Sequence, residues 1–143
     1  MRVLGVDVGE RRIGLAISDR SRTLARPLAT LTVSGASEAV QRVADTIAEL
    51  STEDDGLTTV VVGMPARLDG SPTTETARVA AFVEALKART SASLTFAVED
   101  ERLTSREAES RLAVRERDWR RRKEKLDAAA AAIILQDYLD RIS

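Results

Sequence analysis

The N-terminal segment from Arg2 to Val8 constrains the fold more than any other part of the sequence. It reads RVLGVDV, and apolar residues occupy both of its alternating faces, which is typical of a strand in the middle of a sheet. One carboxylate, Asp7, interrupts it, although aspartate is disfavoured in strands and an ionised side chain is costly to desolvate without a partner. Two explanations remain open from these residues: hydrogen bonds from the tight turn predicted at 9–12, or a bound cation.

The remaining sequence predicts an α/β fold with one mixed five-stranded sheet flanked by helices. Three closely spaced strands begin the chain and predict an antiparallel meander, with Pro27 favouring an edge position for the third. Later strands alternate with amphipathic helices, so strands four and five are predicted to be parallel. The predicted strands after the first lie at 13–18, about 23–33, 58–64 and 93–99. Helices are predicted at 37–50 and at 126–142, and a further helix follows a predicted loop at 65–74. No linker or repeat divides the chain, which indicates a single domain over 1–143.

The composition excludes several kinds of chemistry. The 143 residues include neither cysteine nor histidine, so disulfides, thiolate or imidazole metal ligands, thiol nucleophiles and histidine general bases are ruled out. Catalysis here would rest on carboxylates, hydroxyls, Lys, Arg or a bound metal. We also expect no membrane association and a cytoplasmic location, because the sequence has neither a bilayer-length apolar run nor a signal-peptide pattern.

Acidic residues occur at three positions that this topology can bring together. Asp7 lies in the central strand, Glu99 to Glu101 end the fifth strand, and Asp127 opens the predicted last helix. Clustered carboxylates repel one another unless a cation neutralises them, and a site of oxygen ligands is best suited to Mg²⁺ or Mn²⁺. Two alternatives stay open: Asp127 as a helix N-cap or first-turn acid, and the 99–101 run as a solvated strand end.

A basic segment precedes the last predicted helix. Residues 111–125 contain eight Lys or Arg and three Asp or Glu, in a chain whose formal net charge is −1. Such asymmetry is typical either of a segment that binds a polyanion or of a solvated helix face. Within it, Trp119 either stacks on a base or anchors the segment to the core.

Four motifs resemble those of the YqgF or RuvX-type family, within the RNase H-like superfamily. They occur in the family's order over nearly the whole chain and read VDVGERRIGLAISD, VVGMPARLDGS, DERLTSREAE and KLDAAAAAIILQDYLD. Members of this family are named as pre-16S rRNA nucleases or as Holliday junction resolvases. The resemblance implies an RNase H-like fold, in agreement with the predicted order of elements.

The resemblance also implies roles for individual residues. Asp7, Glu101 and Asp127 correspond to the catalytic, metal-binding carboxylates, with Asp100 as a further metal ligand and Glu99 as a competitor for the place of Glu101. It favours nucleic-acid contact for the basic segment. The residues expected to contact nucleic acid are Arg11, Arg12, Arg67, Arg102, Arg120, Arg121, Arg122, Lys123 and Lys125.

The expected function is therefore a Mg²⁺- or Mn²⁺-dependent endonuclease acting on structured nucleic acid, as a monomer or homodimer. Maturation of the 16S rRNA precursor is the favoured role, and resolution of four-way DNA junctions is the alternative. A non-catalytic nucleic-acid-binding module is a third hypothesis. A sugar-kinase or actin-like ATPase is disfavoured, because its two lobes and second glycine-rich loop do not fit in 143 residues with 7 glycines.

Overall fold

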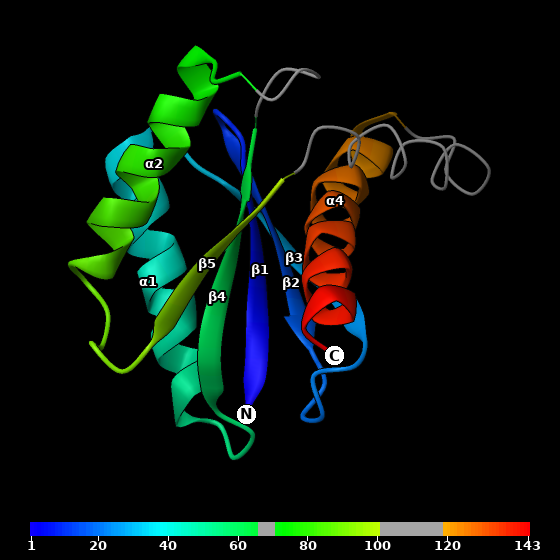
Figure 1. Cartoon of the computed structure of the whole chain (residues 1–143). Helices are drawn as coiled ribbons and strands as arrows, with labels where there is room; N and C mark the ends of the chain where they lie inside the picture. The colour runs from blue at the N-terminus through cyan, green and yellow to red at the C-terminus, as the bar shows by residue number, and fades with distance from the viewer. Residues whose placement is uncertain (66–70, 101–118) are drawn as a thin grey trace.

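A mixed five-stranded sheet forms the centre of the protein (Figure 1). The computed structural model describes residues 1–65, 71–100 and 119–143, with side chains described from Asp127 onward in the last range. The strands are β1 (Arg2–Val8), β2 (Arg12–Ser18), β3 (Ala25–Thr32), β4 (Leu57–Met64) and β5 (Thr95–Asp100), in the order β3-β2-β1-β4-β5. β1 pairs antiparallel with β2 and parallel with β4, β2 is antiparallel to β3, and β4 is parallel to β5. The predicted meander, the parallel pair and the central position of β1 are confirmed, as is the edge position of the Pro27 strand.

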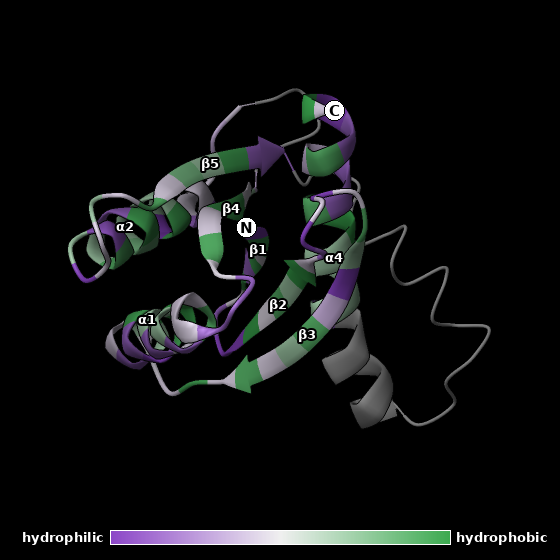
Figure 2. Ribbon diagram, turned by 90° about the horizontal axis from the view of Figure 1, so that it is seen from below, coloured by the Kyte–Doolittle hydropathy of each residue, from purple (hydrophilic) through white to green (hydrophobic). Residues whose placement is uncertain are grey.

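Helices cover both faces of the sheet (Figure 2). α1 (Ala36–Thr52) and α2 (Thr74–Lys87) lie together on one face, and α4 (Trp119–Ile142) crosses the other. Alternate residues of the strands therefore belong to two cores. Leu4, Val6, Ile13, Leu15, Val60 and Val62 pack under α1 and α2, whereas Val3, Ala16 and Val61 pack against Ala131, Ile134 and Leu135 of α4.

The last helix is longer than the sequence pattern predicted. α4 begins at Trp119, so the expected start at Leu126 is wrong by seven residues. Arg and Lys are good helix formers, and they extend the helix from the alanine-rich part into the basic segment. Asp127 consequently lies in the third turn, and its interpretation as an N-cap or first-turn acid is also wrong.

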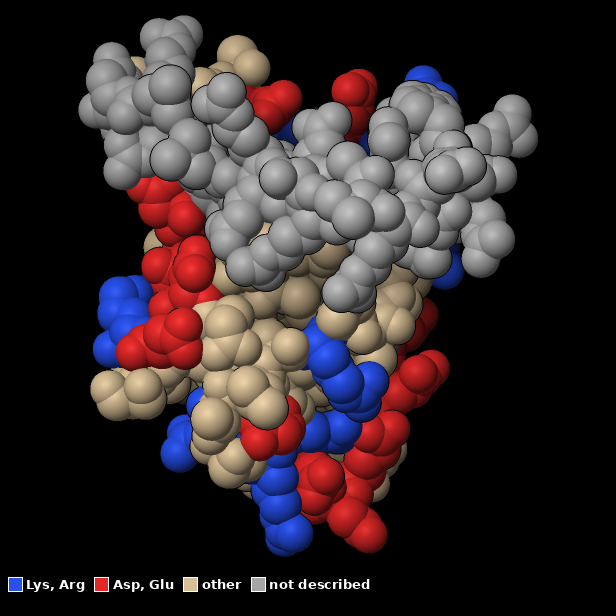
Figure 3. All heavy atoms as spheres, turned by 90° about the vertical axis from the view of Figure 1, so that its right-hand side faces the viewer, with Lys and Arg blue, Asp and Glu red and all other residues tan. Residues whose placement is uncertain are grey.

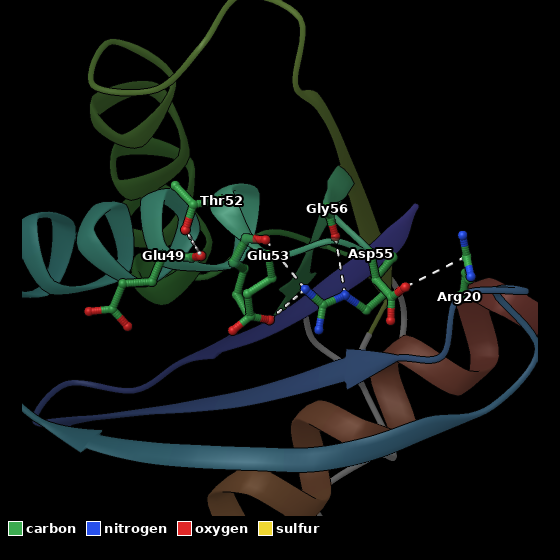
Figure 4. A network of polar contacts seen from close by, with 8 residues as sticks. Arg20, Glu49, Thr52, Glu53, Asp55 and Gly56 are labelled. Carbon is green, nitrogen blue, oxygen red and sulfur yellow. Dashed lines mark hydrogen bonds and ion pairs between the residues drawn. The ribbon is translucent and has the colours of Figure 1, made fainter.

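A buried arginine, Arg2, joins the start of β1 to the end of α1. Its partners Glu53 and Gly56 are labelled in Figure 4. Arg2 is 9% exposed and donates from Nε to the Gly56 carbonyl at 3.2 Å. Its Nη2 donates to the Leu50 carbonyl at 3.3 Å and to the Glu53 carboxylate at 2.8 Å. These bonds satisfy a charge that would be costly to bury alone, and they fix the position of the strand whose other end carries Asp7.

None of the helices in the described part of the chain is both long enough and apolar enough to cross a membrane.

Candidate active site

Asp7 lies near the end of β1 and shares a strand face with Val3 and Gly5. Since alternate strand residues point to opposite faces, this is the α4 side of the sheet. Asp7 is half-buried, and its neighbours Val6 and Val8 belong to the core on the other face. Its partner in the antiparallel ladder is Gly14 of β2. A central strand thus holds one carboxylate rigidly beneath a helix.

The backbone of Asp127 lies directly over that glycine. A Cβ atom built on Gly14 would lie 1.9 Å from the Asp127 carbonyl oxygen and 2.4 Å from its carbonyl carbon. Further along the helix, a Cβ on Gly5 would lie 2.8 Å from Leu135 Cβ and 3.1 Å from the Ala131 carbonyl oxygen. Two strand glycines therefore let α4 approach the sheet closely. The same contact brings Asp127 to the strand position that pairs with Asp7.

Arg12 links the turn between β1 and β2 to Asp127. Its Nε lies 3.5 Å from Oδ2 of Asp127, and the two side chains are 28% and 27% exposed. The turn before it is closed by the Gly9 amide, which donates to the Arg12 carbonyl at 2.9 Å. A guanidinium is thereby held beside Asp127 and partly open to solvent. Arg12 can both neutralise the carboxylate and contact an approaching phosphate.

At the end of β5, Glu99 lies on the α4 side of the sheet. Its ladder partner is Gly63, and the preceding Ala97 packs partly into the α4 core, whereas Asp100 pairs with Met64 and is exposed. The Glu99 carboxylate accepts a hydrogen bond from Arg141 in the last turn of α4. This bond raises the pKa of Arg141 above its ordinary value. Glu99 is thus engaged by the last turn of α4, at the opposite end of that helix from Asp127.

The other expected site residues are placed only in part. Arg11 is exposed in the turn after β1, and the basic residues 120–125 lie in the first turns of α4. Expected residues that lie outside the described part of the chain are Arg67, Glu101 and Arg102. Within the described ranges, no three acidic, cysteine or histidine side chains form a group that could hold a metal. On the face of the protein that carries α4, acidic and basic side chains of the described residues are mixed and do not form a patch of one sign (Figure 3).

Sequence reasoning missed the contact between Gly14 and Asp127. Glycine in a buried strand often marks a place where another backbone approaches closely, and this signal was available at both Gly5 and Gly14. The sequence does not reveal the approaching segment, because Asp127 is more than a hundred residues away. It also does not reveal that Arg141 engages Glu99.

The comparisons with known proteins agree with this geometry. A family profile described as RuvX, Holliday junction resolvase, matches residues 1–141. The chain belongs to the RuvX family. A protein of Chloroflexus aggregans named "Putative pre-16S rRNA nuclease" is 43% identical to this RuvX-family chain over 140 residues, covering 96% of the chain and 92% of that protein. A protein of Thermus thermophilus with the same name is 38% identical over 141 residues, covering 99% and 98%.

Solved structures of low sequence identity share the fold of this RuvX-family chain. Thermus thermophilus RuvC in complex with a Holliday junction substrate aligns with a TM-score of 0.57 at 19% identity, over 100% of this chain and 96% of RuvC. The fowlpox virus Holliday junction resolvase aligns with a TM-score of 0.51 at 16% identity, over 100% of both chains. The RNase H-like fold implied by the sequence motifs is confirmed.

Proposed function

We propose that this RuvX-family chain is a divalent-metal-dependent endonuclease that matures the 16S rRNA precursor. The observation that carries the proposal is the contact of Asp127 with Gly14, the ladder partner of Asp7. It brings two half-buried carboxylates from opposite ends of the chain to one edge of the sheet.

The donor set at this edge suits a hard cation. Asp7 and Asp127 supply oxygen ligands only, and Mg²⁺ and Mn²⁺ prefer carboxylates with water completing the coordination shell. The third carboxylate of the proposal is Glu101. Held by these carboxylates, a divalent cation would supply an activated water and would neutralise charge on the attacked phosphate. Asp100, which the sequence suggested as a further ligand, is the ladder partner of Met64 and therefore lies on the α1 and α2 side of the sheet, away from Asp7.

Residues of the chain itself position the two carboxylates and the phosphodiester. β1 holds Asp7 at a fixed place because its neighbours on both sides of the carboxylate are buried in the core. α4 holds Asp127 against the sheet, and Arg12 lies 3.5 Å from it, where its guanidinium can orient a phosphodiester. The basic residues of the first turns of α4 are the segment that we expect to bind the nucleic-acid backbone, and such binding is salt-sensitive.

Ribosomal RNA is favoured over DNA junctions because of the closeness of the relatives. Proteins named for pre-16S rRNA are about 40% identical to this chain over nearly its full length. Proteins whose titles name Holliday junctions are similar at 16–19% identity, and a shared fold is weak support for a shared substrate. The family's own description nevertheless supports junction cleavage as a second candidate.

The decisive experiment offers both substrates to the purified protein. Labelled 16S rRNA precursor and a four-way DNA junction are incubated with Mg²⁺, with Mn²⁺ and with EDTA. We expect metal-dependent cleavage of the RNA, and a loss of at least a hundredfold in rate for Asp7→Asn and Asp127→Asn. The matched control is Asp54→Asn, an exposed acid in the loop after α1, which should cleave as the wild type does. Titration of Mn²⁺ by calorimetry measures metal affinity independently of activity.

Three results would overturn parts of the proposal. Cleavage that persists in EDTA or in Asp7→Asn would refute the metal mechanism. Paired symmetric nicks in the DNA junction, with the RNA left intact, would show that the protein is a junction resolvase and not an rRNA nuclease. Binding of nucleic acid without cleavage of either substrate would instead favour a non-catalytic binding module.

A further inference from the structure

Arg12 occupies a fixed place at the candidate active site. It begins β2 and shares a strand face with Gly14, over which the backbone of α4 lies. Because Asp7 is the ladder partner of Gly14, Arg12 is the diagonal neighbour of Asp7 on that face. The Arg12 backbone is paired on both sides, with Thr32 in the β3 ladder and with the Gly9 amide. Its side chain can therefore change partner without any movement of the strand.

The ion pair between Arg12 and Asp127 is a weak one. Arg12 Nε lies 3.5 Å from Asp127 Oδ2, whereas charge-assisted hydrogen bonds are typically about 2.7–2.9 Å long. Within the described residues, this ion pair is the one polar contact of the guanidinium. Arg2 shows the opposite case, since it is 9% exposed and donates to Gly56, Leu50 and Glu53. Arg12 is thus an exchangeable arginine, because its partly exposed ion pair costs little to break.

The charge of Arg12 opposes the binding of a cation by Asp127. The oxygen that faces the guanidinium, Oδ2, is shielded from solvent, and salt screens charges weakly at such a place. By Coulomb's law, a guanidinium beside a carboxylate lowers the affinity of that carboxylate for a divalent cation on the order of tenfold. The charge of the ligand set tunes affinity for hard cations in the same way. We therefore expect weak cation binding while Arg12 stays on Asp127.

A backbone phosphate is a better partner for this guanidinium than Asp127 is. Arginine binds phosphate through two parallel hydrogen bonds, and the guanidinium geometry matches the phosphate oxygens. The contact with Asp127 is instead a single ion pair at 3.5 Å. When the guanidinium turns to a phosphate, Asp127 recovers its full negative charge for a cation.

We propose that Arg12 couples the binding of nucleic acid to the binding of the divalent cation, by transferring from Asp127 to a backbone phosphate. The inference rests on the proposed nuclease function and adds an order of events to it. The free protein binds the cation weakly, and the complex with nucleic acid binds it tightly. Since Arg12 acts on the cation through Asp127, it is a positioning residue in this role. By thermodynamic linkage, the cation strengthens nucleic-acid binding by the same factor.

The test measures Mn²⁺ affinity by calorimetry, for the free chain and for the chain bound to RNA. The RNA is the 16S rRNA precursor made with phosphorothioate linkages that resist cleavage, a gel confirms that it stays intact, and RNA alone provides the blank. For the wild type, we expect RNA to strengthen Mn²⁺ binding about tenfold or more. A filter-binding assay of the same RNA with and without Mn²⁺ should give the same factor.

Two substitutions of Arg12 separate its charge from its shape. Free Arg12→Gln should bind Mn²⁺ about fivefold or more tightly than the free wild type, because the opposing charge is gone. RNA should then strengthen its Mn²⁺ binding by less than a third of the wild-type factor. Arg12→Lys keeps a positive charge and should restore weak Mn²⁺ binding in the free chain. Arg26→Gln, on the exposed part of β3, changes the net charge equally and should match the wild type in both states.

The possible results distinguish this inference from the nuclease proposal. Equal Mn²⁺ affinities of free Arg12→Gln and the free wild type would overturn the coupling and leave the nuclease proposal standing. Equal strengthening by RNA in these two proteins would overturn it as well. Absence of Mn²⁺ binding by the wild type in both states would refute the metal site on which both proposals rest. Unfolding midpoints in EDTA confirm that the variants are folded.

Discussion

Substitution of Gly14 by alanine tests the feature on which the candidate active site depends. The added Cβ would lie 1.9 Å from the Asp127 carbonyl oxygen and 3.1 Å from the Ala128 nitrogen. Real Cβ contacts shorter than 3.0 Å essentially never occur, and the obstructing atoms are backbone atoms of a helix. α4 or β2 must therefore move by about 1 Å, because no side-chain rotation can relieve the contact.

The expected cost follows from the rigidity of both elements. Overpacking of a well-packed core typically costs about 1–3 kcal/mol, and a backbone obstruction should lie at the upper end of that range. For a chain of this size, each kcal/mol lowers the melting temperature by roughly 2–4 °C, so we expect a decrease of at least about 6 °C. Chemical and thermal unfolding measure this directly. Mn²⁺ affinity and cleavage rate should fall as well, because Asp127 moves away from Asp7.

Two other glycines provide graded controls. Gly5→Ala meets Leu135 Cβ at 2.8 Å, so its loss of stability should be smaller than that of Gly14→Ala. A Cβ on Gly35 would meet no atom within 4 Å, and the φ of this residue is an extended 178°, so Gly35→Ala should change stability by less than about 1 kcal/mol. If Gly14→Ala has the same melting temperature and the same Mn²⁺ affinity as the wild type, Gly14 does not set the position of α4, and the reasoning is refuted.

Three further predictions concern charged residues. Arg12→Ala should reduce stability by only about 1 kcal/mol or less, because its ion pair with Asp127 is partly exposed, but it should slow cleavage at least tenfold; equal cleavage rates would exclude a phosphate contact. Glu99→Gln should lower the melting temperature slightly through loss of the Arg141 bond while cleavage continues, and a complete loss of cleavage would instead make Glu99 the catalytic acid. Hydrogen bonds from the Ser21 hydroxyl and from the backbone amides of Leu24 and Thr23 lower the pKa of Asp19 from 3.8 to about 2. Its stabilising effect is thus present above pH 3.8 and lost as the pH falls toward 2. The melting-temperature deficit of Asp19→Asn should shrink over that interval, and a carboxyl NMR titration with a midpoint near 3.8 would contradict the assignment.

Local residue patterns were sufficient to predict the sheet. β1 is recognisable because apolar residues occupy both of its faces, and Pro27 marks an edge strand because it cannot donate to a ladder. The spacing of strands and helices then limits how they connect, since a parallel pair requires a crossover. The lack of histidine and cysteine by itself narrows the chemistry to carboxylates, hydroxyls, basic side chains and a bound metal.

The start of α4 was predicted incorrectly because two local signals disagree there. The apolar pattern that marks a buried helix begins at Leu126, but charged residues with high helix propensity continue the helix back to Trp119. Burial and helix formation are separate properties. A pattern of apolar residues indicates which part of a helix is buried, but it does not indicate where the helix begins.

The pairing of distant residues was decided only by the tertiary structure. Sequence spacing marks Asp7 and Asp127 as unusual acids, but it contains no information about the distance between them. That distance depends on Gly14, whose missing side chain lets the Asp127 backbone rest on β2. In the same way, Arg141 engages Glu99 only because α4 crosses the sheet toward β5. Strands and helices form from neighbours along the chain, whereas the site depends on packing between layers, which many separate contacts determine together.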